Sequence, residues 1–361
     1  MDRTVYERLG MKQIAFYLPQ FHTIPENDEW WGKGFTEWVN VKKSKPLFRG
    51  HNQPEVPLQG YYDLGDVKEM VKQAQMAKEY GLYGFCYYHY WFQGKLLLEK
   101  PLEQMLRTPK IDIPFCLCWA NEAWARTWDG SEKQVLMAQN YDENDEQLKS
   151  HFDYFLQFFK DARYIKEDNK PILVIYKPHL IQNIDYVLEF WNKLAIENGF
   201  DGLFFAYQHH SAFSFPEKVK GFDYGIEFEP WFTIDKEEML RKNIIQKIVK
   251  KIRQMPSIVD YDEVWKNILE RTPNGKVYPG AFVSWDNSPR MENRATVVNG
   301  ATPEKFRKYY MKQVERAREV YKSEYIFINA WNEWAEGAHL EPDEKNGYGY
   351  LEAIKRCLND E

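Results

Sequence analysis

The chain has 361 residues and a formal net charge of -6, with 48 basic and 54 acidic side chains spread along its length. It shows no basic stripe of the kind that neutralises a phosphate backbone, which excludes nucleic acid as an expected partner. No window approaches the roughly 18 consecutive apolar residues of a membrane span, and Asp2, Arg3, Glu7 and Arg8 interrupt the stretch where a signal peptide would be apolar. We therefore expect a cytoplasmic protein without a membrane span, whose oligomeric state the sequence leaves open.

Eight runs of apolar, β-branched and aromatic residues have the length of buried strands. They alternate with longer segments whose apolar residues recur three and four positions apart, and several of these segments begin after Asp, Asn or Thr or end in Gly, as helices do. Alternating strands and helices predict a parallel sheet covered on both faces, and eight such units predict a closed (β/α)8 barrel, an α/β fold. In chain order the strand runs are 13–18, 83–91, 114–119, 171–176, 202–207, 222–228, 277–285 and 325–331, and the helical segments are 66–81, 143–162, 184–199, 237–254 and 302–321.

An open doubly wound sheet is the alternative fold. It would be expected to carry a glycine-rich phosphate turn after the first strand, and "YLPQFHTIPEN" contains no glycine. No linker or repeat divides the chain, so we expect residues 1–361 to form a single catalytic domain. Residues 19–64 are too long for an ordinary loop between a strand and a helix, which indicates a functional lid or wall.

Polar and aromatic side chains follow the end of every predicted strand, where a barrel of this class places its active site. Sugar rings offer hydroxyl groups at the rim and C–H faces for stacking, so a ring of such side chains indicates a carbohydrate site. We also expect most of eight strand-end aromatic rings to line one cavity, namely Tyr17, Tyr88, Trp91, Trp119, Trp124, Tyr207, Trp231 and Trp285. The expected partner is an oligosaccharide or polysaccharide, bound by Tyr17, His22, Tyr88, Trp91, Trp119, Asn121, Glu122, Arg126, Tyr207, Glu227, Glu229, Trp285, Asp286 and Asn332.

The candidate catalytic residues are Glu333 and Glu336, which follow the last predicted strand in the stretch "FINAWNEWAEGAHLEP". A turn brings residues three apart to the same side, whereas a strand would separate them. Glycoside cleavage needs two carboxyl groups, one to protonate the leaving oxygen and one to act as base or nucleophile. Burial between Trp331 and Trp334 would raise the pKa of one carboxyl group and keep it protonated.

Three other interpretations stay open at this point. Glu333 could instead form a buried salt bridge with Arg126 or Lys177, while Glu336 caps the turn. Glu122 competes for the role of acid, because an Asn-Glu pair at a strand end is the arrangement of the acid/base in many retaining barrel glycosidases. The histidines lack metal-ligand spacing, so we expect neither a metal nor a cofactor.

Five stretches, "FYLPQFH", "GFTEW", "YYHYW", "CWANEAWARTWDG" and "NAWNEWAEGAHLEP", cover nearly the whole chain. Together they resemble the glycoside hydrolase family 99-like group, also known as WbsX-type glycosyltransferases and found with genes for surface polysaccharides. The resemblance implies a (β/α)8 barrel. The hydrolases of family 99 proper are endo-acting α-mannosidases that retain configuration through a 1,2-anhydro sugar.

The resemblance also implies roles for the two glutamates. The motif Asn-Glu-Trp-x-Glu-Gly matches residues 332–337, which makes Glu333 the base that deprotonates the sugar 2-hydroxyl and Glu336 the acid that protonates the departing oxygen. Ala335 stands where the mannosidases have His, so the motif leaves the sugar open. The chain has no glycine-rich turn for a nucleotide sugar. We therefore favour a retaining endo-glycosidase acting on an α-linked surface polysaccharide over a glycosyltransferase or transglycosylase of lipopolysaccharide, O-antigen or capsule assembly, and over a non-catalytic carbohydrate-binding barrel.

Overall fold

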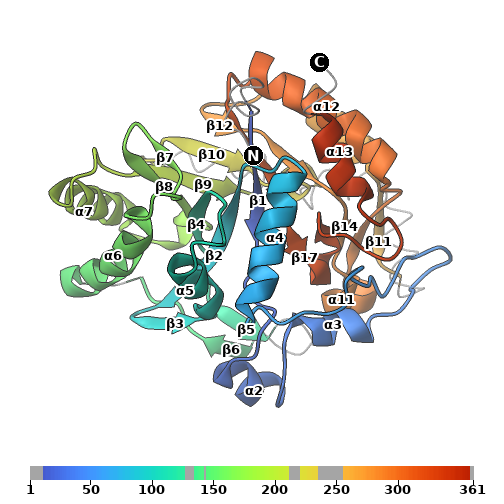
Figure 1. Ribbon diagram of the computed structural model, residues 1–361, viewed down its shortest axis with the longest axis horizontal. Coiled ribbons are helices and arrows are strands. Elements are labelled where there is room, and N and C mark those ends of the chain that lie inside the picture. The colour runs from blue at the N-terminus through green and yellow to red at the C-terminus, as the bar shows by residue number, and fades with distance from the viewer. Residues whose placement is uncertain (1–10, 127–133, 142–143, 211–219, 235–254, 358–361) are drawn as a thin grey trace.

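The computed structural model describes residues 11–126, 134–141, 144–210, 220–234 and 255–357. Parallel strands form a ring with the helices outside it (Figure 1). The strands follow one another around the ring in the order β12-β10-β9-β8-β4-β2-β1-β16-β13. Their bounds are β1 Lys12–Tyr17, β2 Gly84–Phe92, β4 Phe115–Trp119, β8 Lys170–Ile175, β9 Phe204–His209, β10 Tyr224–Glu227, β12 Val277–Tyr278, β13 Gly280–Phe282 and β16 Tyr325–Asn329.

The ring closes through the seventh predicted run, which is divided into β12 and β13 at Pro279. β12 pairs with β10 on one side, and β13 pairs with β16 on the other. Gly280 passes so close to β10 that a Cβ atom there would lie 1.7 Å from the carbonyl oxygen of Glu227, so only glycine fits this crossing. All eight predicted runs thus become barrel strands, which confirms the (β/α)8 prediction and rules out the open sheet.

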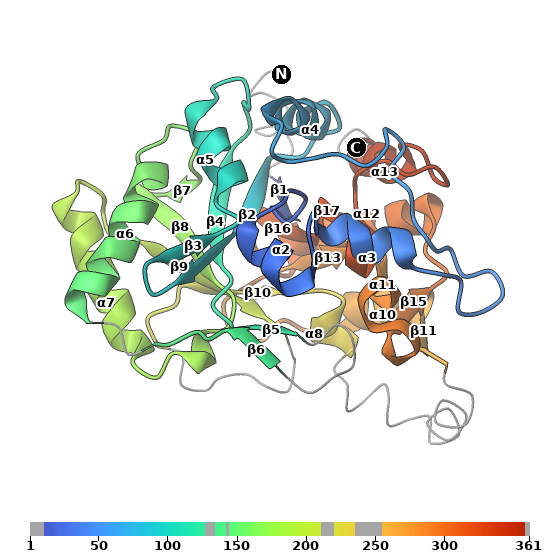
Figure 2. The same ribbon diagram turned by 90° about the horizontal axis from the view of Figure 1, so that it is seen from below.

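The helices begin where the sequence supplies a capping side chain. Asp66 accepts a hydrogen bond from the backbone of Lys68, and Asn144 forms a reciprocal capping box with Gln147. Four of the five predicted helical segments are helices, and the fifth, 237–254, lies outside the described residues. Figure 2 shows α6 and α7 on one flank of the barrel and α12 and α13 on the other. The helices outside the ring are α4 Val67–Glu79, α5 Lys100–Arg107, α6 Asp145–Phe159, α7 Ile184–Glu197, α10 Tyr261–Glu270, α12 Pro303–Glu319 and α13 Gly349–Cys357.

The long segment after β1 carries α2 (Pro25–Trp31) and α3 (Glu37–Lys43) and is fixed against the exit of the last strand (Figure 2). Trp38 of α3 packs on Trp334 with ring centroids 5.8 Å apart. Further along, the Leu58 amide donates to the carbonyl of Pro342 at 2.9 Å. Through these contacts, the segment after β1 forms a wall at the mouth of the barrel. Among the described residues, no helix has the length and apolar character needed to cross a bilayer.

Alternation along each strand decides which side chains face the barrel interior. In β2, Tyr88 faces inward, where Gln208 of β9 donates to its hydroxyl at 3.0 Å. The next residue, His89, faces outward and lies 3.0 Å from His151 of α6. The inward-facing and the outward-facing side chains are both buried, so each strand is apolar along its whole length. The sequence therefore does not show which alternate residues face the barrel interior.

Candidate active site

A cavity of about 400 Å³ opens at the carboxyl ends of the strands. Its wall combines aromatic rings with amide, carboxylate and guanidinium groups, the mixture expected of a small-molecule or sugar site. The residues that line it are Leu18, Gln20, Tyr88, Tyr90, Ala120, Glu122, Ala123, Trp124, Tyr176, His210, Phe228, Trp231, Trp285, Arg290, Asn329, Glu333 and Glu336.

Glu333 and Glu336 reach the cavity from a compact turn after β16. The turn consists of β17 (Asn332–Glu333), the 3-10 helix η3 (Trp334–Glu336) and β18 (Ala338–His339), which pairs back on β17. Asn332 fixes it to β1, because its side chain accepts from the Leu18 amide at 2.7 Å and donates to the Leu18 carbonyl at 3.0 Å. At Gly337, φ is +58°, and a Cβ atom would lie 2.9 Å from the Cβ of Asp286. The turn therefore needs glycine at that position.

Arg290 binds both carboxyl groups of the turn. It lies in α11 (Ser288–Met291), just past β14 (Trp285–Asp286), and its Nη2 stands 2.6 Å from Oε1 of Glu333. Its Nη1 donates to Glu336, and its Nη2 also lies 3.1 Å from Oε2 of Glu37 in α3. The salt-bridge alternative expected a buried ion pair of Glu333 with Arg126 or Lys177. Glu333 pairs with Arg290, and Lys177 pairs with Glu122, while the side chain of Arg126 lies outside the described part of the structure.

Burial dominates the electrostatics of this cluster. It raises the pKa of Glu333 to about 8 and also raises the pKa of Glu336, against the attraction of Arg290. The Glu333 side chain is 8 % exposed, and that of Glu336 is 24 % exposed. Glu37 adds a third buried carboxylate, whose pKa is raised by the same cause. One guanidinium faces three carboxyl groups whose pKa values are all raised, which favours a proton shared within the cluster.

Glu122 lines another part of the cavity wall, where it forms an ion pair with Lys177. The adjacent Asn121 does not reach the cavity. Its side chain donates to the Lys177 carbonyl at 2.9 Å and accepts from the Lys177 amide at 2.7 Å, which ties the end of β4 to the end of β8. Asn121 thus positions the wall that carries Glu122.

Five of the predicted site residues line the cavity, and four predicted aromatic ones do not. Tyr88, Glu122, Trp285, Glu333 and Glu336 do so, together with Trp124 and Trp231. Tyr17, Trp91, Trp119 and Tyr207 occupy the outward phase of their strands, so the expectation that most of the eight rings share the cavity is wrong. Tyr17 donates to Gln73 of α4, Trp91 stacks on His151, Trp119 packs on Trp191, and Tyr207 packs on Phe222.

The predicted binding residues with charged or polar side chains are also mostly structural. Glu227 and Glu229 face outward from the β10 end and share Nη2 of Arg271, each at 2.6 Å. Asp286 accepts hydrogen bonds from His51 at 2.7 Å and Gln53 at 2.6 Å. These contacts correct the prediction that the three carboxylates bind substrate.

Three further predicted binding residues are His22, Asn332 and Arg126. His22 is buried, with its Nδ1 2.9 Å from the Pro19 carbonyl, and Asn332 is the clamp on β1 described above. Neither side chain lines the cavity. Arg126 ends β5 (Trp124–Arg126), and its side chain lies outside the described part of the structure.

The predicted binding and catalytic residues did not include Arg290, Glu37 or Tyr90. Tyr90 stands in the strand-end stretch "YYHYW" and shares the inward phase of Tyr88, because it lies two residues further on. Arg290 follows the seventh strand run in "SWDNSPR", and Glu37 lies in "GFTEW", but nothing in either stretch indicates that the two side chains meet across 253 positions. In the described ranges, no group of three or more His, Cys, Asp or Glu side chains is arranged to hold a metal ion.

A barrel whose strand ends surround a carboxylate pair and a wall of aromatic rings defines a carbohydrate-active enzyme. Comparison with known sequences gives the particular family. Residues 13–354 match the family described as Glycosyltransferase WbsX, and the chain belongs to it. Two curated relatives from strains of Xanthomonas campestris pv. campestris, both named uncharacterized protein WxcX, are 38 % identical over 356 residues. The match covers 98 % of this chain and 50 % of theirs, so the chain spans about half the length of these relatives.

Solved structures share the fold. The GH99 endo-alpha-mannosidase from Bacteroides thetaiotaomicron aligns with a TM-score of 0.56 at 13 % identity, covering 96 % of each chain. A glycoside hydrolase-like protein aligns with a TM-score of 0.62 at 14 % identity, covering 96 % of this chain and 94 % of its own. These findings confirm the resemblance to the family 99-like and WbsX group.

Proposed function

We propose that this barrel is a retaining, endo-acting glycoside hydrolase that cleaves an α-linked surface polysaccharide or its precursor, with mannose-containing chains as the first substrates to test. The observation that carries the proposal is the placement of Glu333 and Glu336 on one guanidinium at the cavity wall. Two carboxyl groups that share one arginine lie close together, which suits a retaining enzyme better than the wider spacing that admits a water in inverting enzymes.

In the proposed reaction, Glu333 accepts the proton of the sugar 2-hydroxyl, whose oxygen attacks the anomeric carbon and forms a 1,2-anhydro ring. The glycosidic C–O bond breaks, and Glu336 donates its proton to the departing oxygen. Water then opens the anhydro ring, with Glu336 as base and Glu333 as acid, so the product regains the original configuration and both carboxyl groups return to their starting states. The roles follow the family motif that residues 332–337 match.

In the free enzyme, burial favours a proton on Glu333, the proposed base, so this division of roles requires that bound substrate moves the proton to Glu336. A substrate 2-hydroxyl that donates to Glu333 favours the ionised form of that carboxyl group, whereas a glycosidic oxygen that accepts from Glu336 favours the protonated form. A base whose pKa lies near the working pH is also stronger than an ordinary carboxylate, and burial raises the pKa of Glu333 to about 8. Arg290 would balance the charge that moves between the two groups.

The remaining wall supports a sugar substrate. Tyr88, Trp124, Trp231 and Trp285 offer ring faces or edges, and Gln20 and Asn329 offer amide groups for hydroxyls. Trp231 and Trp285 meet edge to face with centroids 5.2 Å apart, which forms one corner of the wall.

Transfer of a sugar to a glycan is the second candidate, and the description of the family as glycosyltransferases favours it. Charge weighs against a nucleotide-sugar donor, because Arg290 is the one arginine or lysine among the described lining residues and three carboxylates already engage it. A diphosphate would add negative charge to this wall. Transglycosylation, which uses the same two carboxyl groups, is the form of transfer that fits the site better.

The test is to incubate the purified chain with a panel of α-linked bacterial oligosaccharides, with and without nucleotide sugars. The proposal predicts shorter products of retained configuration from at least one oligosaccharide without any nucleotide. Elongated products that appear only with a nucleotide sugar would establish the glycosyltransferase instead. Binding without any product would indicate the non-catalytic carbohydrate-binding barrel.

A further inference from the structure

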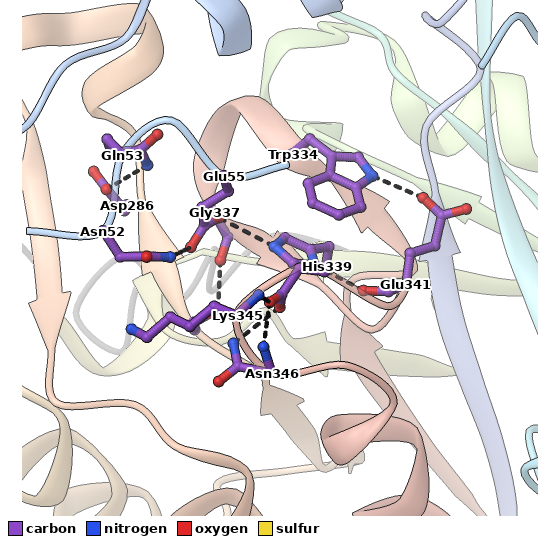
Figure 3. A network of polar contacts seen from close by, with 12 residues as sticks. Asn52, Gln53, Glu55, Asp286, Trp334, Gly337, His339, Glu341, Lys345 and Asn346 are labelled. Atoms are coloured by element: carbon purple, nitrogen blue, oxygen red, sulfur yellow. Dashed lines mark hydrogen bonds and ion pairs between the residues drawn. The ribbon is translucent and has the colours of Figure 1, made fainter. Parts of the chain in front are cut away.

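Trp334 lies between Glu333 and Glu336 in the sequence, but its side chain points away from the cavity and is fully buried. Its ring stacks on His339 with centroids 3.7 Å apart and planes 15° apart. Its Nε1 donates to Oε2 of Glu341 at 2.7 Å (Figure 3). Because Trp334 follows Glu333 directly and begins the 3-10 helix that carries Glu336, the contacts that hold it also restrain the backbone of both glutamates.

Glu341 collects hydrogen bonds from three separate parts of the chain. Besides Trp334, its carboxylate accepts from Nε2 of Gln73 in α4 at 2.7 Å and from the hydroxyl of Tyr62 in the segment after β1 at 2.7 Å. All three donors are neutral groups, and the residue is only 6 % exposed. Two fixed elements and the turn therefore meet at this one carboxylate.

The face of the Trp334 ring is held by His339, which is itself fixed by two hydrogen bonds. His339 places its Nδ1 3.0 Å from the Glu341 carbonyl and its Nε2 3.1 Å from Oε2 of Glu55 (Figure 3). Although burial opposes the charge, the pair with Glu55 raises the pKa of His339. The indole is thus clamped on its face by His339 and at its N–H edge by Glu341.

Burying a carboxylate among neutral donors costs desolvation free energy, which an apolar side chain of the same size would not cost. Burial raises the pKa of Glu341 to about 7, against the three hydrogen bonds that favour the charged form. Once ionised, the carboxylate adds direction, because a charged acceptor holds an N–H group in a shorter and stronger bond than a neutral one does. Catalytic groups lose much of their rate when they shift by about 1 Å, so a directional restraint behind the turn has a chemical use.

We propose that Glu341 is a positioning residue for Glu333 and Glu336, which it orients through the indole N–H of Trp334. The inference rests on the proposed function, because it assigns Glu341 a role in the reaction that those two carboxyl groups perform.

The test compares Glu341→Gln, Trp334→Phe and the double variant with wild type. Trp334→Phe keeps an aromatic ring against His339 but removes the indole N–H. It therefore breaks the same hydrogen bond as Glu341→Gln, at the donor instead of the acceptor. Glu344→Gln is the matched control, because Glu344 lies three residues further on the same segment and is exposed. For each protein, kcat and KM are measured on an oligosaccharide from the panel, and the titration of the Glu333 carboxyl carbon is followed by NMR.

Each single variant should lower kcat by about 10²-fold with little change in KM, and the double variant should lose no more than the worse single one, because both break one link. The Glu333 titration should differ from that of wild type in both variants and match it in the control. A kcat and a titration equal to those of Glu344→Gln would overturn the proposal. If wild type cleaves no glycan, the proposed function fails, while the Glu333 titration still decides whether Glu341 fixes the turn.

Discussion

Nη2 of Arg290 and Oε1 of Glu333 lie 2.6 Å apart, although the two residues follow different strands of the barrel. The same guanidinium binds Glu336 of the turn and Glu37 from the segment after β1. One cation therefore joins three stretches of chain at the wall of the cavity. The stability of the cluster and the protonation of its carboxyl groups both depend on Arg290.

Removing Arg290 should destabilise the fold in a pH-dependent way. Arg290→Met leaves three buried carboxyl groups without their cation, and breaking such a pair typically costs about 3–5 kcal/mol. The loss in the free energy of unfolding should be larger at pH 8 than at pH 5, because protonation relieves the repulsion at the lower pH. Urea unfolding at both pH values measures it, with Arg294→Met as the control, since Arg294 is exposed in the neighbouring turn. Equal losses at the two pH values would contradict the prediction.

Glu333 should make the stability of the protein fall as the pH rises. Its pKa is raised from the ordinary 4.5 to about 8, so in this window the folded state keeps a proton that the unfolded state has released. The contribution is fully present below pH 4.5 and is lost as the pH rises through 8. Glu333→Gln should remove a slope of at most about 1.4 kcal/mol per pH unit. Unfolding free energies measured from pH 5 to pH 9 give the difference, and parallel curves for the two proteins would refute it.

Trp231 should bind sugar rather than take part in the chemistry. Stacking on an aromatic ring contributes about 0.5–1.5 kcal/mol beyond the buried area, so Trp231→Ala should raise KM roughly tenfold with little effect on kcat. The control is Tyr186→Ala, because Tyr186 is 45 % exposed on α7 and does not line the cavity. Steady-state kinetics on the panel substrate decide the matter. A fall in kcat at unchanged KM would assign Trp231 a different role.

The barrel could be predicted because strands buried on both faces read as continuous apolar runs. The same property explains the errors at the site. A run that is apolar throughout does not show which of its alternate residues face inward, so Tyr88 was placed correctly and Trp119, on the adjacent strand β4, was not. Glu333 and Glu336 both line the cavity, as expected from a turn that brings residues three apart to one side.

The charge partner of the two glutamates could not be predicted. Arg290 reaches them from a short helix, and Glu37 reaches Arg290 from 253 positions away, so the contact depends on the closed barrel and on the path of the long segment after β1. The residues around Arg290 and Glu37 in the sequence do not indicate that the two side chains are in contact. The break at Pro279 was also missed, since its neighbours are apolar on both sides.

The most direct test of the account is the rate of Glu333→Gln, Glu336→Gln and Glu122→Gln on a natural oligosaccharide and on an activated aryl glycoside of the same sugar. Removing a positioned acid or base typically lowers the rate by roughly 10² to 10⁴-fold, so the two turn variants should be nearly inactive on the natural substrate. A good leaving group needs no protonation, so Glu336→Gln should recover much of its rate on the activated substrate and Glu333→Gln should not. Rescue of Glu122→Gln instead would place the acid at the end of β4 and contradict the assignment.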